Sequence, residues 1–365
     1  MPDEPIPPHA VSRWLQRLRK IGAAVLGLAT FVLALQLLRR GAGGNGLGVL
    51  LAGLHVSQMA DTLGFGWLMA YLVLSGSPVA AIALTAYSGG ALGDYQAFAM
   101  ITGSRLGASF IVLFVGFLYH LRGHQRTASV SIGVLALLVT ASIYLPALGL
   151  GTLILDQHWL DPVHIAPSQA LNSIISAAFD PIVDLASGYL PVWGVLLLGI
   201  GALLLAFNIF DKALPEVDPQ RSGFGRIADM VYRPAMMFLL GMGVTSLTLS
   251  VSVSLSVLVP LSAKGYVRRE NVPPYIMGAN ITTFVDTLVA AALLAVPAGS
   301  TRTPFTIVLV EMLSVSIFSL LVLGLFYKPY LRLLERVLER VLHDTRTLMF
   351  FLLVILVIPL LLLLT

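Results

Sequence analysis

The chain has 365 residues, of which 57% are hydrophobic and only 11% are charged, and its mean hydropathy is +0.90. A soluble domain carries about 25% charged residues, so a soluble enzyme is excluded. The basic residues are 18 arginines and four lysines against 18 acidic residues. This excess is typical of the cytoplasmic loops of a membrane protein, not of a surface that binds nucleic acid. The chain has no cysteine, which excludes disulfides and thiolate metal sites.

The N-terminal part predicts a cytoplasmic segment followed by a membrane span. Residues 1–20 end in a basic stretch, and the apolar run at 21–38 follows directly. Arg39 and Arg40 come after this run, where a signal peptide would have a small-residue cleavage site. We therefore expect a retained span, and an all-α, multi-pass protein of a cell membrane, such as a bacterial inner membrane.

Two later stretches predict interrupted helices. Residues 65–90 and 234–263 are apolar but rich in Gly, Ser and Thr, with polar residues between the apolar ones. Irregular backbone at membrane depth needs protein or water as a hydrogen-bond partner. Broken or re-entrant helices fit both stretches.

Charge and hydropathy distinguish the regions between and after these stretches. Residues 152–189 contain no Lys or Arg and are expected to form an acidic extracellular loop region. The expected first half is 21–151 and the expected second half is 190–327, on either side of this acidic region. A polar, turn-rich linker at 211–227 is the clearest division of the chain and lies between the two repeat cores named below. Residues 328–346 show an amphipathic pattern that fits either a membrane-interface helix or a solvated connector helix. The apolar run at 347–365 predicts a C-terminal transmembrane segment.

An internal repeat carries most of the functional information. Sliding the chain against itself at one constant offset, without gaps, aligns a core at 64–118 with a core at 239–293. Paired halves with interrupted apolar segments are typical of secondary transporters, whose substrate binds between two inverted repeats. The matched pairs are Gly66 with Gly241, Leu74 with Leu249, Ser75 with Ser250, Ser77 with Ser252, Gly90 with Gly265, Ile101 with Ile276 and Gly103 with Gly278.

The four matched serines predict a site for a small ligand. A hydroxyl group inside a bilayer needs a polar partner, and Ser75, Ser77, Ser250 and Ser252 can converge from opposite sides on one solute. The alternative is that small serines only allow helices to pack closely.

Both repeat cores resemble the sodium/phosphate cotransporter family. That family has two inverted copies of a Gln-Ser-Ser-Ser stretch, each followed by a Gly and then by a Gly-Ala-Asn-Ile-Gly-Thr-Thr segment. Here the copies read LSGS at 74–77 with GSRLGAS at 103–109, and LSVS at 249–252 with GANITT at 278–283. The resemblance implies two inverted repeats, each with a re-entrant hairpin and a broken helix, and sodium-coupled phosphate uptake.

The chain departs from the family at several of these positions. Leu74 and Leu249 replace both Gln residues, Arg105 stands where the first copy would have Asn, and Asp286 stands where the second would have Thr. A guanidinium at that place can neutralise a cation site or bind an anion through two hydrogen bonds. The expected substrate-binding residues are Ser75, Ser77, Ser250, Ser252, Arg105 and Asn280, and the coupling-ion candidates are Thr282, Thr283, Asp286 and Glu311.

Three ionisable residues interrupt otherwise apolar stretches: Arg105, Asp286 and Glu311. A charge at the bilayer centre costs about 2.5–3.5 kcal/mol on insertion scales, so each needs a partner or a cavity. Arg105 and Asp286 can form a buried salt bridge. Alternatively, Asp286 or Glu311 binds a coupling ion or carries a proton, or lies close enough to the interface to reach water.

The sequence therefore predicts an ion-coupled secondary transporter of a small, phosphate-like anion. A Gly-x-x-x-x-Gly-Lys loop is absent, which excludes ATP-driven transport within this chain, and no serine-hydrolase motif is present. Besides the lipid bilayer and an anionic substrate, the expected partner is a second copy in a homodimer. We expect no cofactor other than Na⁺ as a candidate coupling ion. The alternative is a non-transporting scaffold or sensor with a degenerate transporter-like fold.

Overall fold

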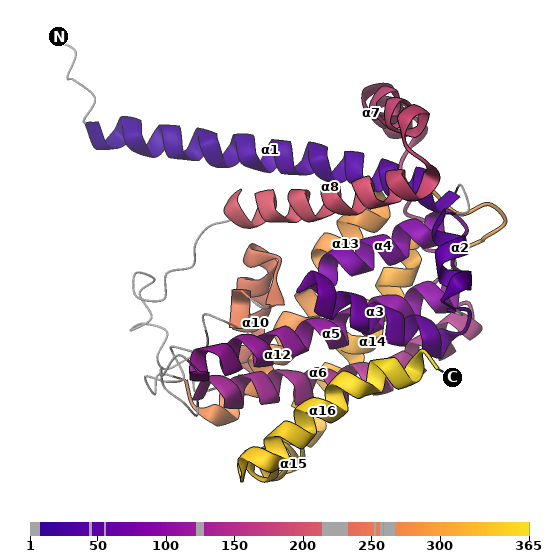
Figure 1. Cartoon of the computed structure of the whole chain (residues 1–365). Helices are drawn as coiled ribbons and strands as arrows, with labels where there is room; N and C mark the ends of the chain where they lie inside the picture. The colour runs from indigo at the N-terminus through magenta and orange to yellow at the C-terminus, as the bar shows by residue number, and fades with distance from the viewer. Residues whose placement is uncertain are drawn as a thin grey trace.

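The computed structural model describes residues 8–43, 46–54, 56–121, 128–213, 233–251, 253–255, 258 and 267–364. Within these ranges the chain is helical and contains no β-strand (Figure 1). Six segments are long and apolar enough to cross a bilayer, which makes the chain a multi-pass membrane protein: Arg19–Ala42, Asp94–Phe114, Val130–Asp156, Val192–Phe210, Arg269–Ala292 and Pro304–Leu342.

The helices follow one another with few long connections. The first part of the chain forms α1 (Pro8–Gly43), α2 (Gly46–Gly53), α3 (Met59–Val73), α4 (Gly76–Ser88), α5 (Asp94–Leu121), α6 (Ala128–Asp156), α7 (Gln169–Tyr189) and α8 (Val192–Ala213). The second part forms α10 (Pro234–Thr248), a 3₁₀ turn (Arg269–Asn271), α12 (Val272–Thr282), α13 (Phe284–Ala292), α14 (Pro304–Leu321), a π-helical turn (Val322–Phe326), α15 (Tyr327–Leu342) and α16 (Thr345–Leu362).

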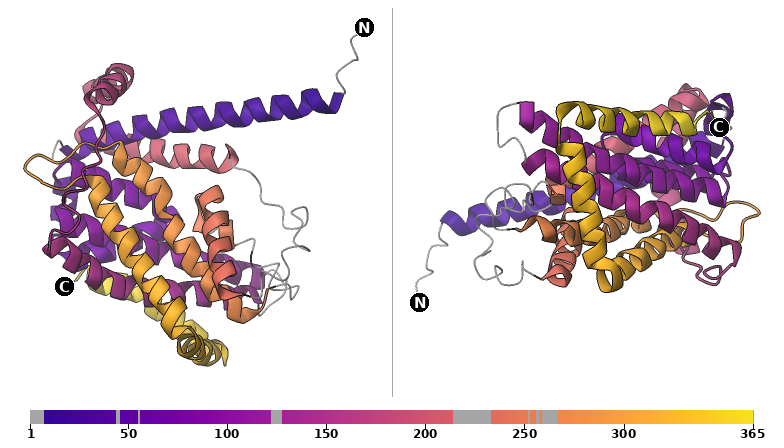
Figure 2. Two further views of the ribbon diagram at one scale, coloured as in Figure 1. Left: turned by 180° about the vertical axis from the view of Figure 1, so that it is seen from behind. Right: turned by 90° about the horizontal axis from the view of Figure 1, so that it is seen from below.

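Helices α1 and α8 lie side by side along one edge of the bundle, and α15 and α16 lie at the opposite edge (Figures 1 and 2). The α1–α8 contacts run in opposite directions along the two helices: Gly41 lies against Leu196, and Phe31 packs on Phe207 with ring centroids 5.7 Å apart. The pair is therefore antiparallel. Most of the buried apolar core lies on α3, α4, α5, α6, α12 and α14 between these edges.

The predicted interruptions in the two serine-containing stretches are present. Helix α3 ends at Leu74, which has a left-handed backbone (φ 54°), and α4 begins after Ser75. Helix α10 ends in the same way at Leu249 (φ 49°). A left-handed backbone is rare for residues other than glycine and is strained. Its recurrence at two leucines that the repeat aligns with each other indicates a common local design.

Helix α3 packs on α5 in the same manner as α10 packs on α12. At four glycines a side chain would collide with a carbonyl oxygen of the neighbouring helix, so the two backbones touch directly. Each close approach in the first part recurs at the aligned position of the second repeat core. The pairs are Gly66 with Met100, Gly241 with Tyr275, Gly103 with Leu63, and Gly278 with Phe238.

At one end of the bundle, the side chain of Arg302, which precedes α14, binds residues at the start of α5, at the end of α6 and after α6. Its guanidinium donates to Asp94 at the start of α5 (2.6 Å), to Asp161 after α6 (2.7 Å) and to the carbonyl of Leu155 (2.6 Å). His158 also contacts this guanidinium through Nδ1, at 2.8 Å. Although burial opposes it, hydrogen bonds from Arg302 and His158 hold the pKa of Asp161 below its usual value.

Three regions differ from the sequence-based expectation or refine it. The expected loop region at 152–189 is largely helical, because it contains α7. Ser168 caps this helix by accepting a hydrogen bond from Leu171 N, and an ion pair between Arg40 and Asp184 joins the helix to α1. The amphipathic segment at 328–346 is helical as α15, with its apolar residues Leu334, Leu338 and Val341 buried. The expected C-terminal span forms α16, which is among the shorter apolar helices. The linker at 211–227 lies mostly outside the described residues.

We expect Gly241→Ala to destabilise the protein. The new Cβ would collide with the carbonyl of Tyr275 and force α10 away from α12, and overpacking typically costs about 1–3 kcal/mol. Gly243→Ala is the matched control, because nothing lies within 4 Å of a Cβ there and alanine favours the helix by about 0.5–1 kcal/mol. Melting temperatures in detergent should fall for the first variant and not for the second; equal melting temperatures would contradict the direct backbone contact.

We expect Arg302→Leu to lower the free energy of unfolding by about 2–3 kcal/mol, because it removes charge-assisted hydrogen bonds to two carboxylates. The pKa of Asp161 is lower in the folded protein than in the unfolded chain. Its contribution to the free energy of unfolding is therefore fully present at pH values above the unfolded-state pKa, and it is lost as the pH falls through the folded-state pKa. The melting-temperature gap between wild type and variant should therefore narrow from pH 7 to pH 3. Arg332→Leu, at an exposed residue of α15, should show little change.

Candidate functional site

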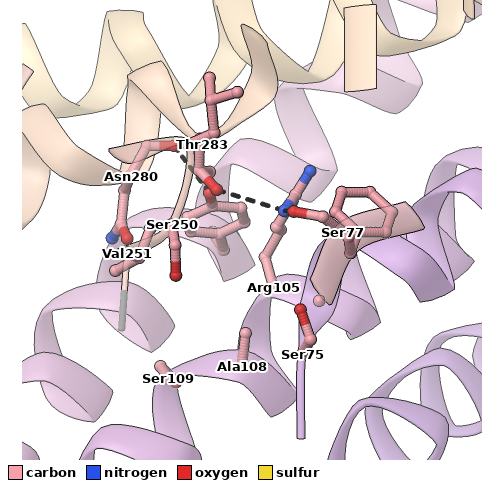
Figure 3. A pocket seen from close by; sticks show the side chains of 13 residues that line it. Ser75, Ser77, Arg105, Ala108, Ser109, Ser250, Val251, Asn280 and Thr283 are labelled. Carbon is pink, nitrogen blue, oxygen red and sulfur yellow. Dashed lines mark hydrogen bonds between the residues drawn. The ribbon is translucent and has the colours of Figure 1, made fainter. Parts of the chain in front are cut away.

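The two helix interruptions meet at one small cavity in the middle of the bundle (Figure 3). Its volume is about 60 Å³, about four times the ~15 Å³ that a single water needs. Polar and apolar side chains line it together. The lining residues are Ser75, Gly76, Ser77, Arg105, Ala108, Ser109, Tyr144, Phe207, Leu249, Ser250, Val251, Asn280 and Thr283.

The cavity lies near the middle of the membrane-spanning helices. Arg105 follows Asp94, the first residue of α5, by eleven residues, which places it about 16 Å along the helix. Tyr144 precedes Asp156, the last residue of α6, by twelve residues, or about 18 Å. Since the hydrocarbon core of a bilayer is about 30 Å thick, both residues lie near its midplane.

Arg105 is the centre of the polar network. Only 4% of this side chain is exposed. Its Nη1 donates to Ser77 Oγ (3.2 Å) and to Thr283 Oγ1 (3.3 Å), and Nη2 donates to Thr287 Oγ1. The guanidinium carbon also lies 5.0 Å from the centre of the Phe284 ring, within the range of a cation–π interaction. Nε has no hydrogen-bond partner.

Asp286 is coupled to Arg105 through a bridging hydroxyl. The closest approach between the two charged groups is 3.8 Å, from Arg105 Nη2 to Asp286 Oδ1. Thr287 accepts from Arg105 and donates to the same Asp286 oxygen at 2.8 Å. The second carboxylate oxygen of Asp286 has no partner. The predicted buried pair is therefore present in part as an ion pair and in part as a threonine-mediated contact.

The N-terminus of α4 faces the same cavity. Ser75 occupies the N-cap position, but its side chain makes no capping hydrogen bond. The first amides of a helix lack intrahelical partners and carry a partial positive charge. Together with Arg105 they give this wall of the cavity a positive potential, and such a helix end is suited to binding an anion.

The opposite wall comes from α12 and α6. The side-chain amide of Asn280 donates to Thr140 Oγ1 (3.0 Å), and the Asn280 carbonyl accepts from Tyr144 OH (3.0 Å). The repeat aligns Asn280 with Arg105, so a neutral amide and a guanidinium occupy matching places in the sequence. The cavity therefore has one wall with a guanidinium and one wall with a neutral side-chain amide.

The structure brings together six of the predicted site residues and separates the others. Ser252 lies outside the described residues. Thr282 bonds back to the carbonyl of Gly278 within its helix, while Asp286 and Glu311 do not line the cavity. Glu311 is buried on α14, with 1% of the residue exposed and no hydrogen bond to either carboxylate oxygen. The six residues that share the cavity are Ser75, Ser77, Arg105, Ser250, Asn280 and Thr283.

Several residues of the network were missed by sequence reasoning. Thr287 follows Thr283 by four residues, and Ser109 follows Arg105 by four, so the 3.6-residue helical period was a signal that could have found both. Tyr144 and Phe207 line the cavity from α6 and α8. No motif marks either one, and only the packing of these helices reveals their role.

Comparisons with protein-family models, with curated protein sequences and with solved structures find no match. Among the residues that the structure describes, no group of three His, Asp or Glu side chains is placed to hold a metal ion.

We expect a double-mutant cycle on Arg105 and Asp286 to show strong coupling. Removing one partner of a buried pair leaves an uncompensated charge and typically costs about 3–5 kcal/mol. Arg105→Leu and Asp286→Leu should each lower the melting temperature in detergent, and the double variant should recover much of the loss. A coupling energy near zero would show that the two charges are stabilised independently.

Thr287→Val is the control that separates the direct contact from the bridged one. It keeps both charges and the side-chain shape but removes the hydroxyl that joins them. We expect a smaller loss, about 1–3 kcal/mol, because buried polar atoms then lack a partner. If the bridge contributes to the pair, the coupling energy between Arg105 and Asp286 should also change in this background.

Proposed function

We propose that this protein is an ion-coupled secondary transporter of a small anion, built from two inverted repeats that alternately open the cavity to the two sides of the membrane. The observation that carries this proposal is the meeting of two interrupted helices with a buried guanidinium at one midplane cavity. Secondary transporters bind their substrates at such interrupted helices, between their repeats.

The directions of the helices support an inverted arrangement. The α3–α4 hairpin starts and ends on one side of the bundle, because Ser57, before α3, accepts a hydrogen bond from Gln96 near the start of α5. Ser88, at the end of α4, donates to the carbonyl of Ala295, just after α13 (2.7 Å). The start of α5 and the end of α13 therefore lie on the same side. In the repeat alignment α5 matches the segment that contains α12 and α13. Because α5 starts on the side where α13 ends, these matching segments run in opposite directions.

The same contacts support a re-entrant hairpin in the first half. Gly103 lies against Leu63 and Gly107 against Trp67, so contacts advance in the same direction along α3 and α5. Helix α4 returns alongside α5, with Gly76 against Ser104, to the side from which α3 entered. The tip of this hairpin, at Ser75, is the part that reaches the cavity.

The basic wall of the cavity supports an anionic substrate. Arg105 contributes a guanidinium, which Asp286 approaches to 3.8 Å from behind, and the α4 N-terminus contributes partial positive charges. An anion entering the cavity can accept from the guanidinium fork and from the hydroxyls of Ser75 and Ser250. The small volume favours a compact inorganic anion, and the resemblance to sodium/phosphate cotransporters makes phosphate the first candidate.

The alternative is a scaffold that does not transport. Leu74 and Leu249 stand at the hairpin tips where the resembled family has glutamine, and 58% of Leu74 is exposed. Loss of two polar groups at the tips favours this alternative. Measured flux separates the two functions directly.

Purified protein in proteoliposomes should take up an anion from a panel that includes phosphate, sulfate and nitrate. Arg105→Gln should reduce uptake at least tenfold, because a hydrogen bond to a charged group contributes about 1.5–3 kcal/mol. Arg346→Gln, at an exposed residue of α16, is the matched control and should leave uptake unchanged. Uptake no greater than in empty liposomes, for every anion and across imposed ion gradients, would favour the scaffold.

A further inference from the structure

Glu311 is a buried acid that does not line the cavity and makes no hydrogen bond with the Arg105 network. It lies seven residues after Pro304, the first residue of α14, or about 10 Å along that helix. Only 1% of the residue is exposed, and neither carboxylate oxygen has a hydrogen-bond partner. An ionised carboxylate in such a place costs several kcal/mol, because neither water nor a donor replaces its hydration.

The groups around Glu311 are engaged elsewhere. Thr102 of α5 lies beside it, but its hydroxyl donates to the carbonyl of Phe98 (3.1 Å). Tyr144 of α6 interacts with Glu311 electrostatically, but its hydroxyl donates to the carbonyl of Asn280. A neutral carboxylic acid therefore fits this environment better than a carboxylate.

The charge count of the buried network leads to the same result. Arg105 is the cation that interacts electrostatically with Glu311, and it also pairs with Asp286, which approaches it to 3.8 Å. Two ionised acids against one guanidinium would leave a buried net charge of −1. One proton on the group removes this charge, and Glu311 is the acid with fewer partners, because Asp286 also accepts from Thr287.

We propose that Glu311 is a proton-binding site and that the proton is the coupling ion of the anion transport proposed above. A proton needs one oxygen atom, whereas a metal cation needs several oxygen ligands. With Glu311 protonated the network is neutral and an anion can bind at Arg105. With Glu311 ionised its negative charge opposes that anion. The proton and the anion therefore each favour the binding of the other, which is the linkage that co-transport requires.

Infrared spectroscopy tests the proton site without requiring transport. Wild-type protein at pH 7 should show the C=O band of a protonated carboxyl group, and ¹³C-glutamate labelling should shift it, which assigns it to a glutamate and not to Asp286. Of the glutamates that the structure describes, only Glu311 is buried. Glu311→Gln should remove the band, and Glu339→Gln, at an exposed residue of α15, should leave it. Absence of a labelled band would overturn the proposal, whether or not the variants fold.

The stability of Glu311→Gln is a second readout. Glutamine has the shape and neutrality of protonated glutamic acid, so the melting temperature should be kept at pH 7. A large fall would show instead that Glu311 is ionised and pairs with Arg105.

Coupling is tested with inorganic phosphate as the probe and a pH-sensitive dye inside proteoliposomes. An inward proton gradient should drive phosphate uptake at least tenfold above the rate without a gradient, and Glu311→Gln should abolish this dependence. Uptake driven only by a sodium gradient would overturn proton coupling. If no anion in the panel is taken up while the glutamate band is present, the proposed transport fails and the proton site stands.

Discussion

The bundle is organised around one guanidinium in its interior. A buried arginine at membrane depth must be matched by acceptors. Arg105 has hydroxyl acceptors on α4, at the junction of α12 and α13, and on α13, and the carboxylate of Asp286 lies behind them. These acceptors come from both parts of the chain. The contact that makes the charge tolerable is therefore also a contact that holds the two parts together.

The interrupted helices satisfy a second constraint that follows from the first. A continuous helix at 59–88 would present only side chains to the cavity, whereas the break at Leu74 exposes backbone amides of α4 beside Arg105. The left-handed conformation of a leucine is the structural cost of this arrangement. The same conformation at Leu249 shows that the second half accepts the same cost. Strain that recurs at matching places, next to the polar midplane cavity described above, is typical of a site and not of a packing defect.

The sequence predicted features that depend on composition and spacing. The hydropathy identified a multi-pass membrane protein, and the constant offset of the repeat located both helix breaks. The offset also matched the four close glycines, but their direct backbone contacts were not predicted. It also placed Ser75, Arg105 and Asn280 at one site. Features that depend on tertiary packing were out of reach: α7 was expected as a loop because its acidic residues hid its helical pattern, and the Thr287 bridge depends on how α13 turns toward α5. The inverted orientation of the halves and the identity of the solute stay predictions.

The two halves differ in the charges that they carry at and around the cavity. Arginine stands on α5 where the matching place on α12 has Asn280, while the two buried acids, Asp286 and Glu311, both belong to the second half. The attraction between cation and acids therefore crosses the boundary between the halves. If one half moves against the other, the contacts of Arg105 with Thr283 and Thr287 must change. An anion bound at the guanidinium can replace them. With both acids ionised, that anion would bring the buried net charge to −2, and a proton on Glu311 reduces it to −1. The proton therefore lowers the cost of carrying the anion, which is the physical reason for the coupling proposed above.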